Sequence, residues 1–220
     1  MRNVPSRAAL AKYNVNRPGW EAVRQSLYDF QTYNAAGHTT MNFFATPNGQ
    51  SGKTLSDTNM TLAGQLPAAQ EFLVNSIEIL FRPSTPAPSA STVDAVVAAP
   101  ALATQINDSY LISRTGNLRF IIGSKPYLEE APLGRFPPKT HFELNSSLAL
   151  ATTVAADSIE SRIAVARWTG RPYLLSPADL RLTSSQNFSV TLNWPEGVQA
   201  IANAARIGVV LDGILYRRSQ

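Results

Sequence analysis

The sequence predicts an all-β protein built as a β-sandwich, and three observations carry this prediction. Polar and apolar residues alternate without a fault over residues 187–194, which places Phe188, Val190 and Leu192 on one face of a strand. A second long apolar run covers residues 206–216. Shorter apolar runs elsewhere are separated by turn residues, and no strand–helix–strand rhythm is present. These patterns favour one large all-β domain over two small ones.

The first 33 residues are expected to form a unit beside the sandwich. Residues 1–17 lack strong periodicity, which predicts an extended or partly helical arm. Pro18 is well tolerated in the first turn of a helix, and apolar residues then follow at near-helical spacing. These residues are Trp20, Val23, Leu27 and Phe30. We therefore expect a basic arm and a short helix over residues 1–33, with the helix docked on a body that spans residues 34–220.

Strands are expected throughout the body. Runs rich in β-branched and aromatic residues, bounded by turn residues, predict strands over 40–45, 72–81, 110–112, 118–122, 141–144, 162–167, 173–182, 187–194 and 206–216. The alternation in the second of these runs changes phase near Asn75 and Ser76, which predicts a β-bulge there.

Two segments of the body predict irregular structure. Residues 82–107 are rich in Pro, Ala and Ser, which indicates an exposed insertion, with a short helix around residues 93–98. Residues 125–138 are rich in Pro and are expected to be irregular as well.

The composition favours a protein whose surface is covered by other protein. Charged residues make up 15% of the chain, against roughly 25% in an ordinary soluble domain. The outward face of the strand over residues 187–194 carries no charge, since it presents Asn187, Ser189, Thr191 and Asn193. The chain has no Cys, no apolar run of membrane-spanning length and no signal-peptide pattern. We therefore expect a soluble product that remains in the cell that makes it or leaves by lysis.

Positive charge is concentrated at the start of the chain. Residues 1–24 contain five basic residues against Glu21 alone, so their net charge of +4 equals that of the whole chain. The basic residues are Arg2, Arg7, Lys12, Arg17 and Arg24. A basic arm on a neutral body predicts contact with a polyanion, either nucleic acid or lipid headgroups. A solvated, disordered tail is the alternative.

No catalytic, cofactor or metal site is predicted. Residues 49–54 imitate a phosphate-binding loop, but Pro47 stands where that motif needs its first Gly. His38 and His141 have no partner at metal-ligand spacing. Glu129 and Glu130 are adjacent in an extended segment, so their side chains are expected to point apart. A hydrolase would need carboxylates or metal ligands that converge from distant strands, which sequence alone leaves open.

Residues 57–77 contain T-N-M followed by G-Q-L-P just before the first long strand, and residues 186–190 and 206–217 supply two closing strands. These segments resemble the jelly-roll major capsid proteins of tailless icosahedral bacteriophages. The resemblance implies a single eight-stranded jelly roll with an N-terminal arm and long loop insertions. A compact double jelly roll is the alternative. It would need about sixteen strands and roughly 145 residues without insertions, and the sequence offers fewer strand-like runs.

The resemblance also implies a function. The chain would be a major capsid subunit that assembles with many copies of itself, and with other capsid or vertex proteins, into a virion shell in the host cytoplasm. It would have no enzymatic activity and no cofactor. The arm would contact viral nucleic acid or an internal membrane, and deletion of residues 1–24 would leave the body folded. Alternatives are a minor capsid or vertex protein, or a carbohydrate-binding module that uses Trp20, Trp168 and Trp194 as a sugar platform.

Overall fold

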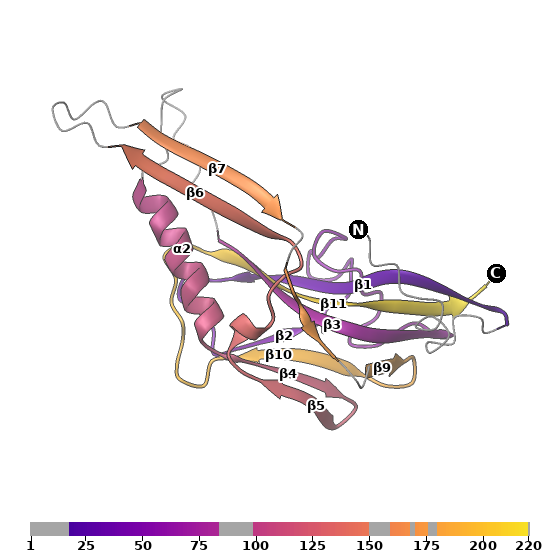
Figure 1. Ribbon diagram of the computed structural model, residues 1–220. Helices are drawn as coiled ribbons and strands as arrows, with labels where there is room; N and C mark the ends of the chain where they lie inside the picture. Colours follow the sequence, from indigo (N-terminus) through magenta and orange to yellow (C-terminus); the bar gives the residue numbers. More distant parts are fainter. Residues whose placement is uncertain (1–17, 84–98, 150–158, 168–169, 176–179, 220) are drawn as a thin grey trace.

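The computed structural model describes residues 18–83, 99–149, 159–167, 170–175 and 180–219. The arm residues 1–17 and most of the Pro/Ala/Ser insertion lie outside these ranges. The described residues form two antiparallel sheets that pack into a sandwich, together with one α-helix and a separate two-stranded ribbon (Figure 1). The prediction of an all-β sandwich is confirmed.

The first sheet, called sheet A here, is built around the last strand. Its strands are β1 (Trp20–Tyr33), β11 (Ala205–Arg218), β3 (Gln70–Arg82), β8 (Tyr173–Leu174) and β9 (Leu180–Thr183). Their order is β1-β11-β3, with β8 and β9 both paired to β3. β1 and β11 pair over all 14 residues of each strand, from Trp20 opposite Arg218 to Tyr33 opposite Ala205. The first and last strands are therefore neighbours along their full length.

The second sheet, called sheet B, contains shorter strands. These are β2 (Thr40–Phe43), β10 (Phe188–Asn193), β4 (Asn117–Ile122) and β5 (Lys125–Glu130), in the order β2-β10-β4-β5. β10 is central, and its even-numbered side chains are buried while its odd-numbered ones are half-buried. The alternation predicted for residues 187–194 is therefore confirmed.

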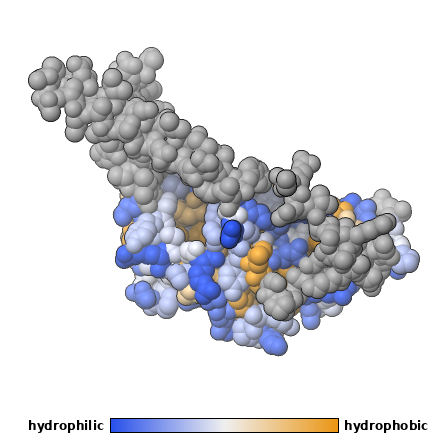
Figure 2. Space-filling view, viewed as in Figure 1, coloured by the Kyte–Doolittle hydropathy of each residue, from blue (hydrophilic) through white to orange (hydrophobic). Residues whose placement is uncertain are grey.

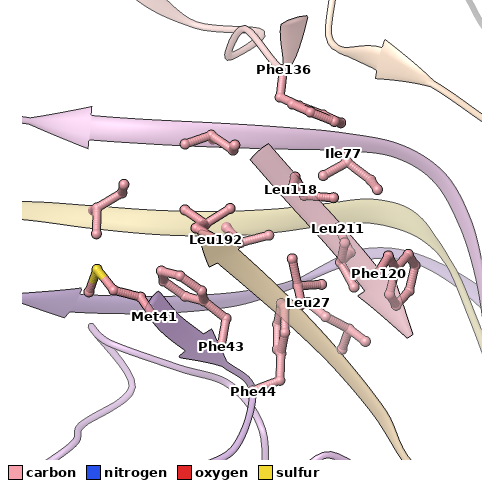
Figure 3. Close-up of a cluster of buried hydrophobic side chains, with 14 of the residues drawn as sticks. Leu27, Met41, Phe43, Phe44, Ile77, Leu118, Phe120, Phe136, Leu192 and Leu211 are labelled. Atoms are coloured by element: carbon pink, nitrogen blue, oxygen red, sulfur yellow. The ribbon is translucent and has the colours of Figure 1, made fainter. Parts of the chain in front are cut away.

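The core lies between the two sheets. Side chains from sheet A meet side chains from sheet B, and the close-up in Figure 3 shows Leu27, Ile77 and Leu211 facing Phe43, Phe120 and Leu192. Phe136, which follows the short 3-10 helix η1 (Leu133–Arg135), closes this core from a connecting segment. Burial of this apolar layer is the main stabilising term of the sandwich.

The bulge predicted near Asn75 is confirmed. Asp212 on β11 pairs with Ser76 on β3, whereas the next residue, Gly213, pairs with Val74. Asn75 is therefore left without a partner in this ladder, which shifts the alternation of β3 by one residue.

The helix predicted after Pro18 is wrong, because residues 20–33 form the edge strand β1. The body therefore begins at β1 and not at residue 34. The deletion of residues 1–24 considered above would remove Trp20 to Arg24, which pair with Arg218 to Ile214 on β11. Only residues 1–17 lie before the described structure.

Three further expectations need correction. Residues 99–114 form the helix α2 (Ala99–Arg114), so the strand predicted at 110–112 is wrong, and the irregular insertion ends earlier than residue 107. Residues 125–130 form β5, within a segment expected to be irregular. The single strand expected over 173–182 is present as β8 and β9, and residues 176–179 between them are outside the described ranges.

The ribbon consists of β6 (His141–Ala149) and β7 (Ile159–Arg167), which pair only with each other in the described structure. It stands off the sandwich in Figure 1, beside one end of α2. It is an insertion between the strands β5 and β8.

Candidate interaction surfaces

The T-N-M segment closes the outer edge of β1. Phe30 N donates to the carbonyl oxygen of Asp57 at 2.7 Å. Asn59 accepts from Tyr28 N at 3.1 Å through Oδ1, and its Nδ2 donates to Ser26 O at 2.8 Å. Thr58 Oγ1 donates to Tyr28 O at 2.9 Å. Backbone groups that an edge strand would expose are thus satisfied by a loop, which blocks pairing with other chains here.

The G-Q-L-P segment ties this loop to sheet B. Gly64 N donates to Phe44 O at 2.7 Å, and Phe188 N donates to Gly64 O at 2.7 Å. Gly64 has φ of 58°, and an added Cβ would lie 2.9 Å from Phe188 O, so Gly is required on both counts. Leu66 is buried in the core. The segment that carries the capsid resemblance therefore has a structural role as a clasp between the sheets.

The loop that imitates a phosphate-binding motif uses its Lys for an internal ion pair. Lys53 Nζ contacts the carboxylate of Asp29, which is fully buried on β1. The same carboxylate accepts from Phe44 N at 2.7 Å. Because Lys53 is committed to Asp29, this loop does not present a free Lys for phosphates, which agrees with the absence of the complete motif.

Asp57 anchors a second cation. Its carboxylate accepts from Thr54 N at 2.8 Å and pairs with Arg206 at 2.6 Å. The hydrogen bonds from Thr54 and the charges of Arg206 and Lys53 hold the pKa of Asp57 below its ordinary value. Asp57 is therefore ionised at neutral pH and joins the loop to β11.

Four charged residues meet on the outer face of sheet A. Lys139 contacts Asp212 and lies 3.5 Å from Glu78, and its backbone N donates to Glu78 at 2.8 Å. Arg24 lies 3.3 Å from Asp212. The carboxylates of Glu78 and Asp212 thus converge from two strands, but two cations compensate them. This arrangement is an ion-pair network that ties the segment before β6 to the sheet.

The basic residues predicted to contact a polyanion divide into two groups. Arg24 lies on β1 and not on the arm, and its side chain is 70% exposed, so it remains accessible beside its partner Asp212. The remaining four, Arg2, Arg7, Lys12 and Arg17, lie outside the described residues.

An apolar groove lies on the outer face of sheet A, along β1, β11 and β3. It encloses about 290 Å³ and is lined by Ser26, Tyr28, Phe30, Glu78, Leu80, Arg82, Thr140 and Val210. A second hollow of about 390 Å³ begins on the other side of Phe30 and reaches Lys53 and Arg206. Phe30, which is 9% exposed, therefore contributes to the lining of both hollows.

The outer face of sheet B carries an uncharged ladder of six side chains. Its members are Thr40, Asn42, Asn117, Ser189, Thr191 and Asn193. They bond to one another across the strands: Thr191 Oγ1 donates to Asn42 Oδ1 at 2.9 Å, and Thr40 Oγ1 donates to Asn193 Oδ1 at 3.1 Å. Figure 2 shows the molecule from the same side as Figure 1. The described surface on this side is mostly hydrophilic, and hydrophobic residues form a narrow streak. Removing neutral polar side chains such as those of this ladder from water costs less free energy than removing charged side chains.

Other candidates have structural roles. Trp194 is 2% exposed and packs on Tyr33, so it cannot line a sugar platform; Trp168 is outside the described residues. Glu129 pairs with Arg119 whereas Glu130 pairs with Arg135, so the two carboxylates serve different partners. Within the described ranges, no three His, Asp or Glu side chains are grouped to hold a metal ion. No helix in these ranges has the length and apolarity needed to cross a bilayer.

Comparison of the chain with protein-family models, curated proteins and solved structures gave no match. Sequence reasoning did not identify the groove or the residues around Phe30. The available signal was the outward set of β3 and β11, where Glu78 interrupts an apolar run and Arg82 and Arg206 stand at strand ends, all at positions of the same parity.

Proposed function

We propose that the sandwich is a single jelly roll. In this proposal β8 and β9 count as one interrupted strand, and the ribbon β6–β7 counts as an insertion. Eight strands then remain. When they are numbered along the chain, their order is first, eighth, third and sixth in sheet A, and second, seventh, fourth and fifth in sheet B. This double Greek-key order is the observation that supports a jelly roll. A double jelly roll is disfavoured, because the other described strands form only a two-stranded ribbon.

The function that best fits this architecture is a capsid subunit that assembles with copies of itself into a closed shell. The uncharged ladder on sheet B supports the proposal, since its neutral side chains can be buried against a neighbour without removing ions from water. The loop that caps Ser26 to Phe30 supports it as well, because it blocks strand pairing along the middle of the β1 edge and favours association through sheet faces and loops. The basic arm would face the enclosed genome or membrane.

Assembly of the purified chain tests the proposal. We expect size-exclusion chromatography with light scattering to give a large species, and negative-stain microscopy of that fraction to show closed particles of uniform size. A protein that stays monomeric at high concentration, in the presence and absence of nucleic acid, would contradict the proposal.

A minor capsid or vertex protein of the same virion is the remaining variant. It would be separated from a major subunit by its copy number per particle. The carbohydrate-binding alternative has lost its main support, because Trp194 belongs to the core. A glycan array on the purified protein tests it directly.

A further inference from the structure

We propose that the outer face of sheet A holds a binding site for single-stranded nucleic acid, in which Arg82 and Arg206 bind a backbone phosphate beside Phe30. The inference adds to the proposed function, since it assigns nucleic-acid contact to the folded body as well as to the arm. It also gives sheet A an orientation, toward the interior of the shell.

The first observation is a pair of like charges. Arg82 on β3 and Arg206 on β11 are direct cross-strand partners. The guanidinium carbons of both residues lie over the same ring, that of Phe30, at 5.2 and 5.0 Å from its centroid. Like charges directly opposite each other destabilise a sheet. An anion bound between the two guanidinium groups would remove this repulsion, and a phosphate diester accepts from Arg in this way.

The second observation is the charge balance around the pair. Arg206 already has a carboxylate partner, Asp57, and also donates to Ser56 O at 2.6 Å. Arg82 forms no ion pair with any residue in the described ranges, although its side chain is exposed. Arg24 and Arg181, which point outward from the same sheet, each pair with a carboxylate. Arg82 and Arg218 are therefore the cations on this face of the described residues that have no carboxylate partner, and of the two Arg82 lies beside the groove and opposite a second Arg.

The third observation is that the ring between the cations is held in place. Phe30 lies directly over Gly208, where an added Cβ would be 2.1 Å from the ring. The ring is thus seated on the backbone of β11, and the two guanidinium groups sit over it. This fixed platform orients both cations before a ligand binds, which lowers the entropic cost of binding.

The shape of the surface favours nucleic acid over a membrane. The groove next to Arg82 is lined by Leu80, Val210 and Tyr28, and its one carboxylate, that of Glu78, has Lys139 as its cation partner. A base can lie there against Tyr28 while its phosphate reaches Arg82, which is the combination of stacking and charge used by proteins that bind single strands. A bilayer surface is flat on this scale and would not enter the groove.

Equilibrium binding of a fluorescein-labelled oligothymidylate of about 20 nucleotides to the full chain, measured by anisotropy over a range of salt concentrations, tests the site. Arg82→Gln should weaken binding by about tenfold and lower the salt slope by about 0.7, the value for one phosphate contact on a single strand. Arg82→Lys should restore most of the slope. Arg119→Gln is the matched control, since it removes an exposed Arg from the outer face of sheet B.

Equal effects of Arg82→Gln and Arg119→Gln would overturn the inference. The inference would also be overturned if Arg82→Gln lost binding to phosphatidylglycerol vesicles but kept its binding to the oligonucleotide, since the site would then serve a lipid surface. Photo-cross-linking of a bromouracil oligonucleotide should label Tyr28 or Phe30, and labelling confined to residues 1–17 would contradict the site. Particle formation is measured separately for each variant. A loss of shell assembly can therefore be distinguished from a loss of oligonucleotide binding.

Discussion

At the scale of single residues, ion pairs hold the loop over residues 45–66 against β1. Asp29 is fully buried and Lys53 is largely buried, so each charge depends on the other. A buried pair contributes little net stability compared with an apolar pair, but removal of one partner leaves an uncompensated charge. This contact could not be predicted from the sequence, because the two residues are 24 positions apart and lie on different elements.

Lys53→Met should therefore lower the free energy of unfolding by about 3 kcal/mol, because the carboxylate of Asp29 remains buried without its cation. Urea denaturation measures this loss. The control is Arg119→Gln, which breaks an exposed pair and should cost less than about 1 kcal/mol. Similar losses in the two variants would show that Asp29 does not depend on Lys53.

The depressed pKa of Asp57 predicts a pH dependence of stability. The ionised form is favoured in the folded state, so its contribution is complete above the unfolded pKa of about 4 and disappears as the pH falls through the lower folded pKa. We expect the stability difference between the wild-type chain and Asp57→Asn to be constant near neutral pH and to shrink in this acidic range. Thermal unfolding of both proteins across that range measures it, and a difference independent of pH would contradict the prediction.

At the scale of elements, strands in which polar and apolar residues alternate regularly could be predicted from the sequence. Strands at a sheet edge and segments covered by loops could not. β10 faces the core on one side and solvent on the other, so its period of two is complete. β1 is different, because its inward positions include Gln25, Asp29 and Gln31, and Phe30 points outward onto Gly208. Asp29 pairs with Lys53 and Gln31 donates to Asn42 O, so these two positions have polar partners in place of apolar ones. The apolar residues that remain follow helical spacing by coincidence.

The helix α2 was missed for a related reason. Its run of Tyr110, Leu111 and Ile112 has high β propensity, but tertiary contacts decide its state. Ile112 is buried in the core, and both carboxylate oxygens of Asp108 accept from Ala202 N at 3.2 Å. The groove on sheet A could not be predicted either, since it depends on the register between β1, β11 and β3.

The boundary of β1 decides which arm deletion is informative. Deletion of residues 1–17 should leave the sandwich folded and impair genome packaging or shell closure, because it removes four basic residues and no described element. Deletion of residues 1–24 should also destabilise the fold, since five residues of β11 lose their partners on β1. Circular dichroism melts and particle counts distinguish the two effects. Normal filling of particles after the shorter deletion would refute the role of the arm.

At the scale of the whole molecule, the two faces of the sandwich differ in charge. Sheet A carries several compensated ion pairs and the pair of Arg82 with Arg206, whereas the outer face of sheet B combines the neutral ladder with one exposed pair, Arg119 and Glu129. In the proposed shell, this asymmetry would place sheet B against neighbouring copies and sheet A toward the contents. The sequence signalled the neutral face through β10, but the contributions of β2 and β4 depend on their pairing with it.

A charge placed on the neutral face should therefore block assembly without unfolding the subunit. Ser189→Lys adds a cation that would be buried in the proposed contact, at a desolvation cost of several kcal/mol. Its cross-strand partner on β4 is Ile121, so the new cation meets no like charge there. Light scattering should show smaller species at an unchanged melting temperature. Gln50→Lys, which places the same charge on an exposed loop, should assemble normally. Equal assembly of the two variants would place the contact elsewhere.

The central place of β11 in sheet A also has a consequence during synthesis. β1 and β3 have no direct ladder between them, so the sheet has a vacant slot until residues 205–218 have left the ribosome. A nascent chain shorter than this cannot bury its apolar layer and must remain loosely organised. If the chain assembles as proposed, subunits competent to associate would arise only after this strand is inserted, so neighbouring nascent chains on one message would not join prematurely.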